Sequence, residues 1–355
     1  MNGNTIKKAV TLAGFAALAG LGTMIGSTAA TAATATPGAS AAPAAIGGKT
    51  VAYVRAGVIY SSDGYNEVRL TEDEVNARPR FSPDGTKLTY LHNDTVWVMN
   101  ADGSGKRQVS DRVAGGASWS PDGSWIAYAA LSCTGGPGVF RVAADGPAGA
   151  VSQPLFPASC RDQAVPEVAY ITEQATEQPT EQATEQPTEQ AAEQAAEVKP
   201  GKLVDRLRTD DAVAWSPDGS KIAFRGGECE SIADNCLSVG NVETGTERAI
   251  DYYGGGGSGT SGFGVVPAWS PDGQKVTWTT YTEDGTAVRV TEADADGGNR
   301  HQIGAADDRE MVYAGRRTGV LTASHQGHSW VTAVDLATGA RTPLHQGSQP
   351  TVQAR

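Results

Sequence analysis

The sequence has few of the features typical of nucleic-acid-binding or zinc-binding proteins. Its 28 Lys and Arg residues are outnumbered by 40 Asp and Glu, which gives a formal net charge of −12. Binding to nucleic-acid phosphates needs a basic surface, so we expect no nucleic-acid partner. None of the four cysteines has Cys-x-x-Cys spacing, which disfavours the rival interpretation of a four-cysteine zinc site.

Long apolar runs are also scarce, and the one that stands out lies at the N-terminus. Lys7 and Lys8 precede an apolar stretch over residues 9–25, and small residues follow over residues 30–35. This layout predicts a signal peptide over residues 1–35, followed by an Ala- and Pro-rich linker over residues 36–48. We expect a secreted mature chain, or one held in the cell envelope, without a membrane span. An uncleaved membrane anchor is the alternative.

The cysteines fall into two local couples, Cys133 with Cys160 and Cys229 with Cys236. In an exported protein an even number of cysteines indicates disulfides. Four cysteines permit three pairings, and the sequence favours the two local ones.

An internal repeat organises the rest of the chain. Four segments align without gaps, and each has an aromatic residue followed by Ser-Pro-Asp-Gly. The turn residues are Pro83, Asp84, Gly85, Pro121, Asp122, Gly123, Pro217, Asp218, Gly219, Pro271, Asp272 and Gly273. Pro presets φ, Asp bonds to nearby backbone and Gly accepts positive φ, so each copy predicts a tight turn with a structural role. An aliphatic, a small and an aromatic residue follow in each copy, which predicts a strand with one bulky face.

A second strand pair follows each unit, and six such pairs can be counted along the chain. A repeated four-stranded unit of about 40 residues is typical of a propeller blade. The sequence therefore predicts an all-β fold, a single β-propeller of six blades over residues 49–355. Blade one lacks its own opening strand, and residues 349–352 could supply it and close the ring. A seventh blade using residues 165–170 is the alternative.

A low-complexity tract of Thr-Glu-Gln-Ala and Thr-Glu-Gln-Pro units occupies residues 172–197. It has no aliphatic residue larger than Ala, and its prolines interrupt any helix. We expect a disordered Glu/Gln-rich insertion.

The four repeats resemble the PD40, or TolB-like, β-propeller repeats, a WD40-like family. The resemblance implies a secreted or periplasmic propeller that binds other proteins. The chain looks like a TolB-family protein without the N-terminal α/β domain of full TolB proteins, which makes a Tol–Pal role doubtful. The repeats are also similar to the propellers of prolyl-oligopeptidase-type enzymes.

Strand polarity sorts the loops onto two faces. The turn face carries the first-to-second and third-to-fourth strand turns, all of them short. The loop face carries the second-to-third strand loops, the links between blades, the Glu/Gln tract, the loop over residues 254–264 and both cysteine couples. The loop-face acids are Glu72, Asp73, Glu74, Glu228, Glu230, Asp234, Glu283, Asp284, Asp307 and Asp308. Variable loops gathered on one face are where repeat proteins usually bind, and solubility is the competing explanation for the acids.

Catalytic motifs are scarce, and we predict a non-catalytic, monomeric scaffold with no cofactor, no metal and no catalytic residues. Its loop face would bind an extracellular or envelope protein or peptide. The alternative is a small hydrolase or lyase with its site at the mouth of the central channel. His325, His328 and His345 could meet at a metal on the loop face, although scattered surface histidines are the commoner explanation.

Overall fold

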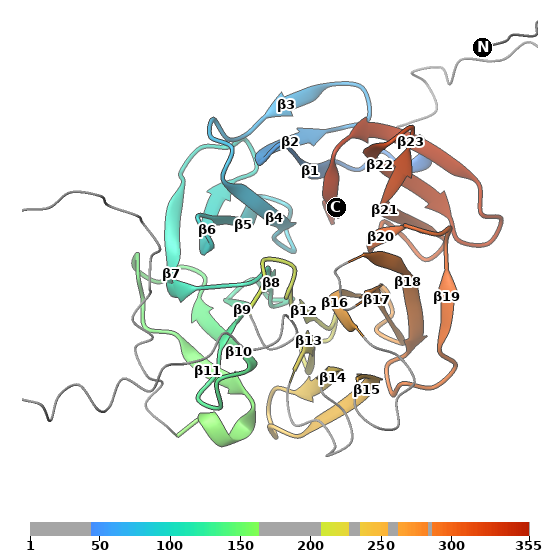
Figure 1. Ribbon diagram of the computed structural model, residues 1–355. Helices are drawn as coiled ribbons and strands as arrows, with labels where there is room; N and C mark the ends of the chain where they lie inside the picture. The colour runs from blue at the N-terminus through green and yellow to red at the C-terminus, as the bar shows by residue number, and fades with distance from the viewer. Residues whose placement is uncertain (1–43, 163–206, 227–234, 255–261, 283–285, 355) are drawn as a thin grey trace, which may run out of the picture. The chain divides into compact units, whose positions relative to one another are not determined.

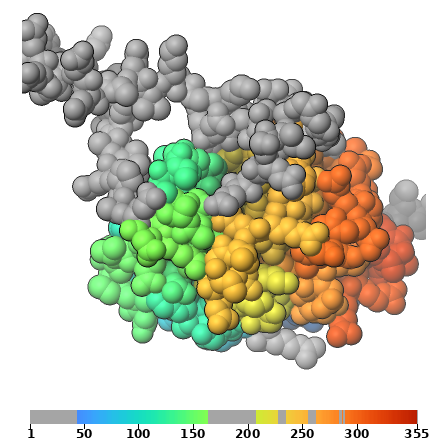
Figure 2. All heavy atoms as spheres, turned by 90° about the horizontal axis from the view of Figure 1, so that it is seen from below, coloured from blue at the N-terminus to red at the C-terminus, as the bar shows by residue number. Residues whose placement is uncertain are grey.

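The computed structural model describes residues 44–162, 207–226, 235–254, 262–282 and 286–354. Within them, 24 strands form six four-stranded antiparallel sheets. The sheets stand around a common axis as the blades of a propeller (Figure 1), and Figure 2 shows blades 3 to 6 following one another around the rim, from green to orange-red. The predicted all-β, six-bladed fold is confirmed.

Each blade is numbered in chain order, and its strands are given from the inside outward. Blade 1 holds β24 (Ser348–Val352), β1 (Val51–Arg55), β2 (Val58–Ser62) and β3 (Glu67–Arg69). Blade 2 holds β4 (Asn76–Phe81), β5 (Lys87–His92), β6 (Thr95–Asn100) and β7 (Arg107–Val113). Blade 3 holds β8 (Ala117–Trp119), β9 (Trp125–Leu131), β10 (Pro137–Ala143) and β11 (Gln153–Phe156), after which comes a short 3-10 helix, η1 (Ala158–Cys160).

The second half of the ring follows the same pattern. Blade 4 holds β12 (Ala214–Trp215), β13 (Lys221–Arg225), β14 (Asn235–Asn241) and β15 (Glu247–Tyr253). Blade 5 holds β16 (Phe263–Trp269), β17 (Lys275–Tyr281), β18 (Ala287–Asp294) and β19 (His301–Ile303). Blade 6 holds β20 (Arg309–Tyr313), β21 (Thr318–His325), β22 (His328–Asp335) and β23 (Arg341–Gln346).

The repeat forms the inner half of blades 2 to 5. In each of them the aromatic before Ser-Pro-Asp-Gly pairs with the aliphatic residue of the next strand, as Trp119 pairs with Ile126. That aliphatic residue is fully buried in all four copies, and the aromatic two positions later is at most 2% exposed. Burying one such side chain contributes roughly 1.5–3 kcal/mol. The repeated pattern therefore supplies much of the packing between blades.

The ring closes in blade 1 through the C-terminal strand. β24 pairs antiparallel with β1, with Val352 opposite Val51, so the chain's last strand provides the innermost strand of its first blade. The sequence predicted this closure from residues 349–352. Ile46, at the end of the expected linker, is buried with Tyr53, Val320 and Val331 at the same junction. Residues just before β1 thus help to hold the closure.

Several predictions fall outside the described residues. These are the signal peptide over residues 1–35, the alternative seventh blade over residues 165–170 and the Glu/Gln-rich tract over residues 172–197. No helix in the described part of the chain is long and apolar enough to cross a membrane.

Candidate functional site

The turn face is held together by its own side chains. In the first copy of the repeat, the Ser82 hydroxyl donates to Asp84 at 2.6 Å, and the backbone N–H of Thr86 donates to the same carboxylate at 3.0 Å. The other three copies repeat both bonds. The serine hydroxyl first, and then its other donors, lower the pKa of Asp84 and of Asp122 to about 2. These carboxylates are ionised acceptors that fix the turns, as their sequence context predicts.

Grooves open on this face between the outer halves of neighbouring blades. The groove between blades 5 and 6 has a volume of about 680 Å³. The buried Glu292 lies in its wall and accepts from Lys275 Nζ at 2.5 Å and from the Tyr313 hydroxyl at 2.7 Å. Similar grooves lie between blades 3 and 4 and between blades 4 and 5, with volumes of about 750 and 860 Å³. Sequence reasoning missed them, because each is formed by two blades that are adjacent only in the folded ring.

The central channel is lined by one equivalent residue from each blade, which lies three positions before the last residue of the innermost strand. In blades 3 and 4 this residue comes just before the strand begins. Around the ring from blade 1 these residues are Gln349, Arg78, Gly116, Ala212, Val266 and Glu310. Four of them adopt positive φ, namely Arg78, Val266, Glu310 and Gln349. Irregular strand pairing occurs at each of these four positions, as expected for β-bulges that redirect a side chain.

Charged residues cross the channel at the closure. Arg78 of blade 2 and Glu310 of blade 6 form an ion pair at 2.8 Å, and both side chains are more than nine-tenths buried. Gln349 of blade 1 lies between them in the ring: its backbone N–H donates to Glu310 at 2.8 Å, and its side-chain oxygen accepts from the Arg78 N–H at 2.7 Å. Burial opposes ionisation of Glu310, but Arg78 and the Thr322 hydroxyl outweigh it and hold the pKa of Glu310 below its usual value. The network therefore joins blades 2, 1 and 6 around an ionised carboxylate.

Two further ion pairs stand at the loop-face end of the channel, just before and within blade 4. Arg225 contacts Asp211 through two nitrogens, with Nη2 at 2.6 Å from Oδ2, and both side chains are 1% exposed. Arg208 bonds to Asp210 at 2.8 Å and lies over the ring of Phe263, with Cζ 4.5 Å from the ring centroid. The channel mouth thus gathers arginines and carboxylates, and they are paired with one another.

Sequence reasoning did not single out these channel residues. The signal was present in the aligned repeats, where Arg78 and Glu310 occupy a position that holds Gly116, Ala212 and Val266 in other blades. A charge at a position that is otherwise small or apolar marks a special contact.

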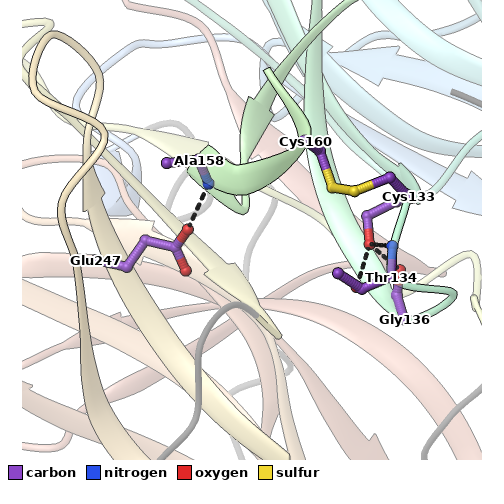
Figure 3. Close-up of a disulfide and its surroundings, with 7 residues drawn as sticks. Cys133, Thr134, Gly136, Ala158, Cys160 and Glu247 are labelled. Atoms are coloured by element: carbon purple, nitrogen blue, oxygen red, sulfur yellow. Dashed lines mark hydrogen bonds between the residues drawn. A yellow bond between two sulfur atoms is a disulfide. The ribbon is translucent and has the colours of Figure 1, made fainter. Parts of the chain in front are cut away.

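A disulfide joins two segments of the loop face. Cys133, in the loop between β9 and β10, bonds to Cys160 in η1, at the start of the link to blade 4 (Figure 3). Beside it, the Ala158 N–H donates to Glu247 of blade 4 at 3.2 Å. The first predicted disulfide is confirmed. The second involves Cys229, which lies outside the described residues.

Of the acids predicted for the loop face, Glu72, Asp73 and Glu74 are exposed, whereas Asp308 is buried. Glu72 keeps 88% of its side chain exposed, and Glu74 is also exposed. Asp73 accepts from the Asn76 side chain at 2.5 Å, and the buried Asp308 is paired with Arg341 at 2.6 Å. Two of the acids thus stabilise the links that carry them. Glu228, Glu230, Asp234, Glu283 and Asp284 lie outside the described residues.

The structure does not bring the three candidate histidines together. His325 and His328 pair across the end of the β21–β22 hairpin, and His325 packs edge-on against Trp330. His345 lies on β23, where its Nε2 is 2.8 Å from the Ser62 hydroxyl and its ring stacks on Tyr53. Among the described residues, no three metal-ligating side chains form a cluster that could hold an ion.

Comparison with known proteins shows similarity of fold alone. No protein family and no curated protein is matched by the sequence. Among solved structures, TolB from Acinetobacter baumannii aligns with a TM-score of 0.56 and 13% identity over 86% of this chain and 66% of its own, slightly under two thirds. A putative TolB from Agrobacterium tumefaciens aligns with a TM-score of 0.54 and 14% identity, over 84% of this chain and 90% of its own.

A propeller from a nidogen/laminin complex is equally similar. Its TM-score is 0.54, at 10% identity, over 86% of this chain and 98% of its own. The chain is therefore a TolB-like propeller in architecture, and the same fold serves proteins that differ widely in sequence.

Proposed function

We propose that this protein is a non-catalytic scaffold, exported from the cytoplasm as a monomer, that binds a protein or peptide partner through its loop face. The observation that carries the proposal is the difference between the two faces. The turn-face carboxylates of the repeat are used internally to hold short turns, whereas the loop face presents exposed acids and a disulfide-linked loop. Loops positioned by a rigid scaffold are the usual place for binding.

The partner's chemistry follows from the exposed acids. Glu72 and Glu74 stand on the link between blades 1 and 2 and expose two carboxylates, of which that of Glu72 also lies 3.8 Å from the exposed Arg69 side chain. Charges of one sign attract a segment of the opposite sign, so we propose that the partner presents a lysine- or arginine-rich segment. The nidogen propeller, solved in a complex with laminin, is a precedent for protein binding by this fold.

The channel mouth gives less support to a hydrolase or lyase. A general acid or base must be free to exchange a proton with a substrate. Here Glu310, Asp210 and Asp211 each contact an arginine, and the pKa values of Glu310 and Asp210 lie below their usual range, because their arginines outweigh the effect of burial. These pairs are better suited to hold the ring than to transfer protons.

The test is recovery of partners from culture medium and envelope extract with the full protein as bait. Glu72→Gln/Glu74→Gln should lose the partner at low salt, whereas the turn-face control Asp145→Asn/Glu243→Gln, which changes the net charge equally, should retain it. Both control acids are exposed on turn-face loops. Equal loss in the two variants would indicate a non-specific charge effect and would contradict the proposal. If both variants bound the partner as well as wild type does, the binding site would not include Glu72 and Glu74, which would also contradict the proposal.

A further inference from the structure

One arginine in the channel has no partner of its own. Arg80, on the innermost strand of blade 2, lies two residues after Arg78 and lines the same central cavity. Among the described residues, no hydrogen bond or ion pair reaches its guanidinium group, although its backbone oxygen accepts from Trp119. The equivalent residues in the other blades are Ser118, Ala214, Ala268, Val312 and Thr351, so Arg80 is the one charged residue at this level of the ring.

An arginine without a counter-charge is unusual at a position as enclosed as that of Arg80. The side chain lies deep inside the molecule yet keeps some accessible surface, because that surface faces the channel. Burial first, and then repulsion from Arg78, lower the pKa of Arg80 to about 10. The group therefore stays cationic at neutral pH. A charge held inside a protein needs a counter-charge, and the carboxylate that acts on Arg80, Glu310, is already paired with Arg78. Asp210 also acts on Arg78, but it is paired with Arg208.

Arg78 also has a nitrogen without a hydrogen-bond partner among the described residues. Its Nη1 contacts Glu310, but its buried Nε has no hydrogen-bond partner among the described residues. Buried guanidinium N–H groups are strong donors that almost always find an acceptor. Two arginines thus line one cavity with unused donors, within a chain whose net charge is −12.

The cavity itself is small. Its free volume is about 10 Å³, room for about one water-sized sphere. Gly116 and Ala212 form part of its wall, and a Cβ atom added to Gly116 would lie 2.7 Å from that of Ala212. A space of this size favours a small anion over phosphate, sulfate or a peptide carboxylate.

From these observations we infer that the central channel binds a single monatomic anion of the halide class, chloride in practice, between Arg78 and Arg80. The anion accepts from the unused donors of both arginines and balances the second positive charge that Glu310 leaves uncompensated. A water molecule fits the same space but supplies no charge. The anion would link blade 2 to the closure network at the centre of the ring.

The first test is thermal unfolding of the full chain at constant ionic strength, with chloride exchanged for methanesulfonate, a bulkier anion of the same charge. A ligand that binds only the folded state raises the unfolding midpoint with its concentration. We expect the wild-type midpoint to rise with chloride by several degrees. Arg80→Gln should show no chloride response and should unfold at a higher temperature than wild type when chloride is absent, because the uncompensated charge is gone. Arg316→Gln, an exposed arginine on the turn face, should respond as wild type does.

Identical chloride responses in wild type and Arg80→Gln would overturn the proposal. If Arg80→Gln fails to fold, wild-type protein alone still decides the matter. Crystals grown in bromide should show an anomalous peak between Arg78 and Arg80, at the position filled by chloride in ordinary crystals. A peak there that has no anomalous signal in bromide would identify water only and would refute the anion site.

Discussion

The two ends of this propeller use the same kinds of residue for different purposes. At the turn face, the Asp of each Ser-Pro-Asp-Gly turn bonds within its own turn, so the same contacts recur in four blades. At the loop-face end of the channel each ion pair occurs once, and one of them, Arg78 with Glu310, joins the two ends of the ring across 232 positions of sequence. Local, repeated contacts define the blade, whereas long-range, single contacts define how the ring closes.

This difference separates stability from recognition. On the turn face, the polar side chains of the repeat bond to one another within each turn. At the channel mouth, buried carboxylates pair with arginines of the same protein. Exposed charge remains on the links of the loop face, as at Glu72. Substitutions at the three places should therefore differ in both size and kind of effect.

Glu310→Gln should have the largest effect on stability. The change removes the carboxylate that pairs with Arg78, and breaking a buried ion pair from one side costs about 3–5 kcal/mol. We expect a loss of that size in the free energy of unfolding, measured by urea titration. The double variant Arg78→Met/Glu310→Leu should lose less than Glu310→Gln, because it removes both charges of the pair. An equal loss in both would show that shape rather than charge holds the closure.

Removal of the disulfide should have the second-largest effect on stability. The Cys133–Cys160 bond spans a sequence separation of 27, and closing a loop of this length contributes about 3–4 kcal/mol in the chain-entropy model. Cys133→Ser/Cys160→Ser should therefore lower the unfolding midpoint while leaving circular dichroism of the folded state unchanged. A midpoint within one degree of wild type would mean that the bond constrains only the surface of the loop face.

The turn-face carboxylates should make the stability of the protein depend on pH. Hydrogen bonds in the folded state lower the pKa of Asp122 to about 2, below the value of about 3.9 of an unfolded Asp. The stability from this shift is therefore present above pH 4 and is lost as the pH falls from 4 to 2. Because Asp122 is exposed, we expect less than about 1 kcal/mol from it. Asp122→Asn should flatten the acid limb of a stability–pH curve, and Asp145→Asn, whose side chain is exposed on the same face, should leave that limb as in wild type.

Much of this fold could be predicted from sequence because the repeat is local. Four Ser-Pro-Asp-Gly turns and their aliphatic and aromatic partners identify blades 2 to 5, and residues 349–352 identify the closing strand. β20 of blade 6 gave no such signal, since Tyr313 is followed by Ala and Gly instead of Ser-Pro-Asp-Gly. The channel residues were missed for a different reason. Arg78 and Glu310 are 232 positions apart, and their contact exists only after the ring has closed.

The three acids on the link between blades 1 and 2 should show the smallest effects on stability. All three side chains are exposed, but Asp73, between Glu72 and Glu74, also accepts from the Asn76 side chain at 2.5 Å. Asp73→Ala should cost about 1 kcal/mol of unfolding free energy, because it removes the acceptor of a hydrogen bond that holds the link. Glu72→Gln and Glu74→Gln should each change stability by less than about 0.5 kcal/mol while weakening partner binding. If Glu72→Gln destabilised the protein as much as Asp73→Ala, the exposed acids would belong to the scaffold, and the loop face would no longer differ from the turn face in how it uses its charges.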